Sequence, residues 1–171
     1  MTTQPAVSEF DIVLKRTYDA PVGMLWRAWT DPEQMKQWWG PEGFTNPVCE
    51  LDVRVGGAWR IVMRGPDGTD YPVKGIYREI LPNRRLVMTD SVAEQSQDWH
   101  DLVNASRPEG SGKSPEEYLI TVTFDEKNGK TTVSVRTHFN SAADRDALME
   151  IGMSEGWNGS FNKLTDLLKT S

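Results

Sequence analysis

The fold of this chain is decided near its end, where residues 149–168 read MEIGMSEGWNGSFNKLTDLL. Large apolar side chains recur there three or four residues apart, at Met149, Met153, Trp157, Phe161, Leu164 and Leu168. At about 100° per residue these side chains share one broad face of an α-helix. The pattern therefore predicts one long C-terminal helix that lies as a lid on a concave apolar surface.

Three glycines, Gly152, Gly156 and Gly159, interrupt this predicted helix. A glycine inside a helix costs roughly 0.5–1 kcal/mol relative to alanine, so each one needs a structural reason. Close approach to another backbone, a bend, or open space beside the helix would each supply one. The first reading makes the glycines packing devices on a sheet, and the last makes them part of a pocket wall.

The composition limits the classes of protein to consider. The chain has 171 residues, enough for one domain with a sizeable core. Its net charge of −6 leaves no basic patch for binding nucleic acid. We expect a flexible N-terminus at 1–8 and a single domain at 9–171, which contains a long loop at about 91–114.

The location of the protein is suggested by its cysteine content and its N-terminus. Cys49 is the single cysteine and cannot form an internal disulfide, which fits a reducing compartment. The first residues lack the basic and apolar regions of a secretion signal, and no run approaches the roughly 20 apolar residues of a membrane span. These features predict a cytoplasmic protein without a membrane span.

Alternation of apolar and polar residues places the strands. Residues 9–18 predict the first strand, and Pro21 then begins a short helical pattern. Asp31 before Pro32, with Gln34 as its capping-box partner, predicts a second short helix that ends at Trp38. Turn residues then separate predicted strands at 48–55, 58–64, 71–81, 84–90, 118–124 and 133–139. The order predicts an α+β architecture, a curved antiparallel sheet with the terminal helix on one face.

Several local strings support a more specific assignment. They are DAP at 19–21, LWRAWTDP at 25–32, WWGP at 38–41, GGAWR at 56–60, GPDG at 65–68, GIYREI at 75–80, PNRRL at 82–86 and GW at 156–157. With the order of elements, they resemble the activator of heat-shock-protein-90 ATPase homologue family, within the SRPBCC (START-like, helix-grip) superfamily. The resemblance covers about residues 10–168.

The resemblance carries clear expectations for the fold. It implies a helix-grip (START/Bet v-like) architecture in which seven antiparallel strands grip the C-terminal helix. It also implies a deep cavity between sheet and helix, which in relatives binds lipids, polyketides or other apolar molecules. About half of the residues in the shared strings are glycine, proline or tryptophan, which specify turns and packing, so the strings do not identify a reaction.

Residues capable of catalysis are few. The sequence contains no metal-binding or phosphate-binding motif, and we expect no metal and no cofactor. His138 lies on the predicted outer face of its strand and should face solvent. His100, between Asp98 and Asp101, is a weak acid–base candidate if its loop covers the mouth of the cavity. The alternative is an exposed loop histidine.

Glu79 is the second weak catalytic candidate. It shares a strand face with Val73 and Tyr77, and the pattern does not decide whether that face points inward. A buried carboxylate must find a partner or become protonated. Glu79 is therefore either an ion-pair partner at the rim of the sheet, with Arg60, Arg78 and Arg85 available, or a polar anchor for a ligand.

The expected ligand-binding residues are the large aromatic and methionine side chains that the fold turns toward the last helix. They are Trp39, Phe44, Trp59, Met63, Tyr77, Met88, Tyr118, Met153, Trp157 and Phe161. Aromatic rings with a polar tip suit an apolar ligand that carries one polar group. Of the adjacent Trp38 and Trp39, we expect one to pack and the other to be exposed.

Three functions remain open at this point. The leading hypothesis is a small-molecule binding or carrier domain, acting as a monomer or homodimer, which holds an apolar or aromatic ligand in the cavity. The first alternative is a co-chaperone-like module that binds a chaperone. The second is a cyclase- or hydrolase-like enzyme that uses the same cavity, although the scarcity of catalytic groups favours a protein that is not an enzyme.

Overall fold

The computed structural model describes residues 10–105, 107, 117–139, 141–150 and 152–170. The N-terminus expected at 1–8 lies outside the described residues, as does the end of the loop expected at 91–114. The helices and strands, in chain order, are β1 (Ile12–Tyr18), α1 (Val22–Thr30), α2 (Pro32–Trp38), β2 (Thr45–Leu51), β3 (Ala58–Arg64), β4 (Asp70–Leu81), β5 (Arg85–Ser91), α3 (Gln97–Ala105), β6 (Glu117–Lys127), β7 (Lys130–His138), α4 (Ala142–Glu150) and α5 (Met153–Lys169).

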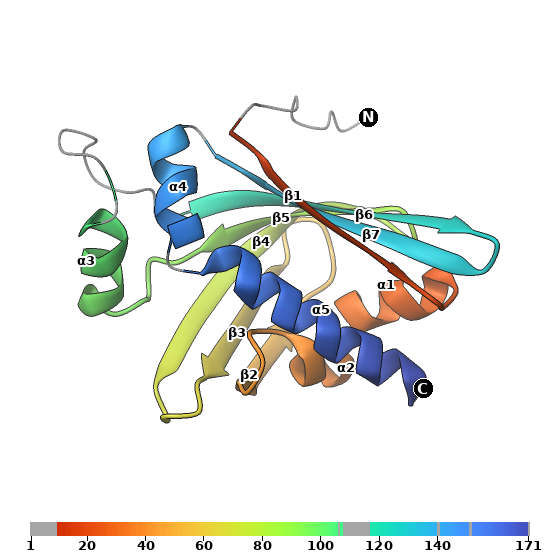
Figure 1. Ribbon diagram of the computed structural model, residues 1–171. Coiled ribbons are helices and arrows are strands. Elements are labelled where there is room, and N and C mark those ends of the chain that lie inside the picture. The colour runs from red at the N-terminus through yellow and green to blue at the C-terminus, as the bar shows by residue number, and fades with distance from the viewer. Residues whose placement is uncertain (1–9, 106, 108–116, 140, 151, 171) are drawn as a thin grey trace.

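The described strands form a seven-stranded antiparallel sheet in the order β1-β7-β6-β5-β4-β3-β2. All but one of the neighbouring pairs are consecutive in the chain, whereas β1 pairs with β7, so that Ile12 lies opposite Thr137. Helix α5 crosses one face of this curved sheet, with α1 and α2 beside its C-terminal half (Figure 1). The expected α+β fold, in which a sheet grips the last helix, is confirmed.

Helix α2 begins where the sequence predicts it, and α1 begins at Val22, one residue after Pro21, which is its N-cap. The carboxylate of Asp31 accepts a hydrogen bond from the backbone N–H of Glu33 at 2.9 Å, and Pro32 occupies the first position of α2. This is the expected N-cap arrangement. The backbone N–H of Asp31 donates to the carbonyl of Arg27 instead of taking part in a capping box with Gln34.

The C-terminal apolar pattern is divided between two helices. Met149 belongs to α4, and α5 begins at Met153 after Gly152, whose φ of +99° lies in the left-handed region. A side chain with a Cβ adopts that conformation only with strain. Gly152 therefore explains one of the three glycines: it is the point at which the chain changes direction before α5.

The expected long loop also contains regular structure. Helix α3 occupies Gln97–Ala105, within the range that the sequence predicts to be a loop. It packs on a small second core formed by Val92, Val103, Tyr118, Phe139, Ala147 and Leu148. Helix α3 thus lies with α4 at one end of the sheet, on the left in Figure 1.

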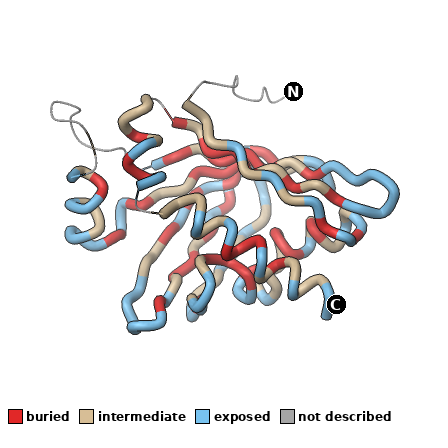
Figure 2. The backbone as a smooth tube through the Cα atoms, viewed as in Figure 1, coloured by how far each residue is buried: buried red, intermediate tan, exposed pale blue. Residues whose placement is uncertain are grey.

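The main core lies between the sheet and the helices α1, α2 and α5. Its largest fully buried side chains include Trp29, Trp38, Trp59, Tyr77 and Phe161. In Figure 2 the buried segments gather in this layer, and the tips of the hairpins are exposed. Burial raises the pKa of the Cys49 thiol to about 11, so the thiol is protonated at neutral pH. The described part of the chain contains no helix with the length and apolar character needed to span a bilayer.

Candidate functional site

The first wall of the candidate site is the segment that follows α2. The indole N–H of Trp38 donates to the carbonyl of Ala28 at 2.9 Å, and the side-chain amide of Asn46 donates to the carbonyl of Trp39 at 2.8 Å. The first bond fixes the indole of Trp38, the second fixes the backbone of Trp39, and both side chains are buried. The expectation that one of them would be exposed is wrong, because each packs against Trp29, with centroids 4.8 and 6.1 Å away.

Helix α5 forms the second wall and is tied to the same segment by polar side chains. Ser160 Oγ donates to the carbonyl of Gly40 at 2.9 Å. Lys163 Nζ donates to the carbonyls of Trp39 and Pro41 at 3.2 and 3.1 Å. Burial lowers the pKa of this lysine. Hydrogen bonds from a charged donor are stronger than neutral ones, so helix and segment form a firm frame.

The two remaining glycines, Gly156 and Gly159, contact the segment after α2 in different ways. A Cβ at Gly159 would lie 2.7 Å from the backbone nitrogen of Glu42, so this glycine permits close packing of two backbones. A Cβ at Gly156 would lie 3.5 Å from Cγ of Pro41, which is an ordinary contact. Gly156 also borders open space. Each of the three explanations offered by the sequence thus applies to a different glycine.

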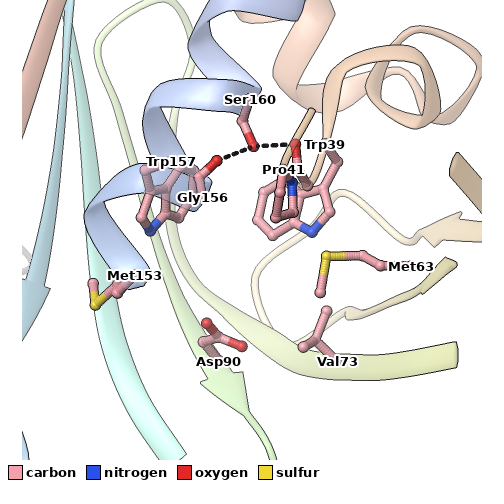
Figure 3. Close-up of a pocket in the computed structure, with 10 residues that line it drawn as sticks. Trp39, Pro41, Met63, Val73, Asp90, Met153, Gly156, Trp157 and Ser160 are labelled. Atoms are coloured by element: carbon pink, nitrogen blue, oxygen red, sulfur yellow. Dashed lines mark hydrogen bonds between the residues drawn. The ribbon is translucent and has the colours of Figure 1, made fainter. Parts of the chain in front are cut away.

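A small, partly open pocket remains between the N-terminal half of α5, the segment 39–41 and strands β3, β4 and β5 (Figure 3). Its volume is about 150 Å³. It is lined by Trp39, Gly40, Pro41, Met63, Val73, Asp90, Met153, Gly156, Trp157 and Ser160. The indoles of Trp39 and Trp157 meet edge to face, with centroids 5.3 Å apart. Two indoles and two thioethers make most of the wall apolar and polarisable.

Asp90, near the end of β5, is the exception in this apolar wall. The residue is half-buried, but its Oδ1 is shielded from solvent and has no hydrogen-bond partner among the described residues. Burial raises the pKa of this carboxyl to about 7. Lys74 on the neighbouring strand pairs with Glu94 at 3.0 Å. Asp90 is therefore a carboxyl group poised between its two protonation states at neutral pH.

The ten expected ligand-binding residues divide into two groups. Trp39, Met63, Met153 and Trp157 line the pocket. The others lie elsewhere: Trp59, Tyr77, Met88 and Phe161 in the main core, Tyr118 in the second core, and Phe44 against Tyr71 with ring centroids 5.8 Å apart. The core side chains fill much of the space beneath α5, and the described pocket is confined to the N-terminal end of that helix.

The two weak catalytic candidates lie away from the pocket. Glu79 is buried on the inward face of β4 beside Tyr77, which settles the orientation that the sequence left open. It accepts a hydrogen bond from Nε of Arg85. His100 lies in α3, half-exposed, with its ring edge-on to Trp99 at 5.2 Å. Neither side chain lines the pocket, and their catalytic roles stay predictions.

His138 is less exposed than its strand position indicated. Its Nδ1 lies 2.7 Å from Oδ1 of Asp11, and 31% of its side chain is accessible. Asp11 also lies 3.5 Å from Nε of Arg136. The pairing arises because β1 and β7 are neighbours, which the strand pattern alone does not reveal. In the described part of the chain no three histidine, cysteine, aspartate or glutamate side chains gather in a way that could hold a metal ion.

Sequence reasoning missed Asp90, together with Pro41, Val73 and Ser160. A signal for Asp90 was present, because it shares a strand face with Leu86 and Met88. Both of those side chains are fully buried against the helices. A charged residue that continues an inward apolar face is a candidate for a functional site. Ser160 and Pro41 carried no comparable signal, since their role depends on how α5 meets the segment after α2.

Comparison with known proteins agrees with this architecture. A protein of known structure from Nitrosomonas europaea is similar with a TM-score of 0.77 and 25% identity, covering 96% of this chain and 97% of that one. A protein from Chromobacterium violaceum reaches 0.70 at 26% identity, covering 92% and 96%. The AHSA1 protein from Silicibacter pomeroyi reaches 0.70 at 23% identity, covering 94% and 98%, a likeness that bears on the fold alone. Curated proteins gave no match.

The family comparison covers nearly the whole described fold. The family model described as "Activator of Hsp90 ATPase homolog 1-like protein" matches residues 19–169, from the turn before α1 to the end of α5. This range contains both walls of the pocket and Asp90. The family that the sequence strings suggested is therefore confirmed, and the chain belongs to the Activator of Hsp90 ATPase homolog 1-like family.

Proposed function

We propose that this protein binds a small, largely apolar molecule in the pocket between α5, the segment 39–41 and strands β3 to β5. The observation that carries the proposal is the wall itself, in which Trp39, Trp157, Met63 and Met153 surround about 150 Å³ with one carboxyl group. Ligand sites commonly combine an apolar lining with a few polar groups that orient the ligand.

The frame of the pocket supports the proposal. Ser160 and Lys163 fix the two walls to each other through hydrogen bonds to Gly40, Trp39 and Pro41. A pocket held open in advance binds with a smaller loss of conformational entropy than one that must form around its ligand. The free energy gained when the ligand contacts the apolar lining is therefore not offset by the cost of ordering the pocket.

The size of the pocket limits the ligand. A cavity of about 150 Å³ in another protein holds benzene, and this pocket has a similar volume with an opening to solvent. The aromatic residues that would have lined a deeper cavity, such as Trp59 and Tyr77, are packed in the core. We therefore expect a ligand of about the size of one aromatic ring with a short substituent, rather than a long lipid chain.

A panel of ring-sized apolar compounds tests the proposal by thermal shift and tryptophan fluorescence. A ligand at about 100 times its Kd should add about 2.7 kcal/mol of stability. Gly156→Leu should fill the pocket and abolish the shift. Asn158→Leu is the matched control, since it adds the same side chain at an exposed position of α5. Absence of any shift across the panel, or a shift that survives Gly156→Leu, would contradict the proposal.

A further inference from the structure

The carboxyl group of Asp90 borders the pocket, and no cation among the described residues contributes to its pKa. Asp90 is the one ionisable side chain among the described pocket residues. Its Oδ1 is buried and lacks a hydrogen-bond partner within the described structure. Moving a carboxylate out of water is costly unless a cation or several hydrogen bonds compensate for the lost hydration. Burial alone accounts for the raised pKa of Asp90, with no contribution from a neighbouring cation.

The rest of the wall also favours positive charge. Trp39 and Trp157 present indole rings to the same small space, and the face of an indole attracts a cation within about 6 Å. The sulfur atoms of Met63 and Met153 are polarisable neighbours. In Figure 3 the carboxylate of Asp90 lies on the strand side of the pocket, opposite the helix that carries Trp157. An anionic ligand would meet repulsion from the same carboxylate.

From this arrangement we infer that the ligand is a small amine cation, with an apolar or aromatic body lying among Trp39, Trp157 and Met63 and an ammonium group paired with Asp90. The inference rests on the proposed function, because it names the chemical class that the same pocket would take. It assigns Asp90 the role of recognising charge. The ligand supplies the positive charge that the described pocket lacks.

Three ring-sized probes that differ in charge test the inference on the wild-type protein by calorimetry. They are benzylamine, benzyl alcohol and benzoate. At about pH 8 benzylamine should bind at least about 10-fold more tightly than benzyl alcohol, and benzoate most weakly. Benzyl alcohol binding as tightly as benzylamine, with both blocked by Gly156→Leu, would overturn the amine inference and leave the binding proposal intact. Failure of every probe and of the wider apolar panel would overturn both.

Asp90→Asn tests the role of the carboxylate itself. Asparagine keeps the shape of the side chain and removes its charge, so benzylamine should lose at least about 10-fold in affinity while benzyl alcohol changes little. Asp125→Asn on β6 is the matched control, since this aspartate is exposed outside the pocket. Equal affinity of benzylamine for the wild type and for Asp90→Asn would overturn the inference.

The pH dependence of binding supplies a second readout. Tyr118 lies directly opposite Asp90 on β6, and Arg107 and Asp144, which pair with each other at 2.8 Å, act electrostatically on Tyr118. On the other neighbouring elements, Lys74 of β4 is paired with Glu94, and Glu155 of α5 is exposed. Burial raises the pKa of Tyr118, so this phenol stays neutral in the relevant range. Because only ionised Asp90 pairs with the ammonium, benzylamine affinity should fall by up to about 100-fold from about pH 8 to about pH 5. An unchanged affinity across that range would contradict the pairing.

Discussion

The two halves of α5 lie on the same sheet but meet different surroundings. In the C-terminal half, Phe161 and Leu164 are fully buried, and Lys163 is bonded to carbonyls of the segment after α2. In the N-terminal half, Met153 and Trp157 are half-buried and border the pocket. One helix thus combines a packed end with an open end.

This difference separates two contributions of the helix. Side chains of the packed end remove apolar surface from water and stabilise the fold. Side chains of the open end retain exposed surface, so replacing them should change ligand binding more than stability. The contrast shows that regular apolar spacing along a helix does not mean that every apolar side chain in it is buried in the core.

The largest effect on stability is expected at the packed end. Phe161→Ala should reduce the free energy of unfolding by about 3–5 kcal/mol, because Phe161 is 1% exposed and leaves a cavity. Trp157→Ala should cost less, since its side chain is only half-buried, yet it should weaken ligand binding more. Urea unfolding and probe titration on both variants check the comparison. Equal stability losses would contradict the proposed division of the helix.

The next effect concerns pH at the open end. An unfolded aspartate has a pKa of about 3.9, whereas burial raises that of Asp90 to about 7. Between these values the folded protein holds a proton that the unfolded chain has lost. The contribution of Asp90 to the free energy of unfolding is therefore fully present below about pH 4. It decreases by about 4 kcal/mol as the pH rises to about 7.

Asp90→Asn isolates this contribution, since asparagine does not titrate. The free energy of unfolding of the variant should exceed that of the wild type increasingly as pH rises from about 4 to about 7. Asp125→Asn, at an exposed site, should keep the wild-type profile. Parallel profiles for the wild type and Asp90→Asn would show that the carboxyl is well hydrated in the folded state.

Gly159→Ala should have a smaller effect on the packed end. Its new Cβ would lie 2.7 Å from the backbone nitrogen of Glu42, so helix and segment must separate. Overpacking of this kind costs about 1–3 kcal/mol, partly offset by the better helix propensity of alanine. Thermal unfolding measures the loss. A more stable variant would mean that the segment containing Glu42 moves freely.

Gly156→Ala should have the smallest effect on stability and the opposite sign. Its Cβ meets Pro41 at 3.5 Å, an ordinary contact, so the gain in helix propensity of about 0.5–1 kcal/mol should remain. Because the methyl group enters the pocket wall, ligand affinity should fall by about 3-fold to 10-fold. A loss of stability without a change in affinity would place Gly156 in the packed end instead.

Most strands could be predicted from the sequence because the two faces of the sheet differ in burial. The strand predicted at 48–55 is displaced, since β2 spans Thr45–Leu51. The alternation of apolar and polar residues predicted the observed bounds of β3, Ala58–Arg64, and Asp31 with Pro32 predicted the start of α2. The split of the predicted helix into α4 and α5 at Gly152 was not predicted. The apolar spacing continues across Gly152, and the presence of a glycine does not determine its φ angle. The pairing of His138 with Asp11 also depends on topology rather than on local pattern.

The pocket was only partly predictable for a different reason. Periodicity identifies which side chains face inward, but not which of them touch one another. Trp59 and Trp157 carry the same sequence signal, yet Trp59 fills the core while Trp157 borders open space. Asp90 could have been found by following the inward face of β5 to its end. Ser160 and Pro41 required the packing of two segments far apart in the chain.

The pairing of β1 with β7 has a consequence for how the molecule folds. Ile12 lies opposite Thr137, so this edge of the sheet closes a loop of more than a hundred residues. Such contacts raise the contact order of a protein and slow its folding, because chain entropy is lost before the pairing contributes stability. During synthesis β1 emerges first and its partner strand near the end. The first strand must therefore wait for almost the whole domain before its edge is covered.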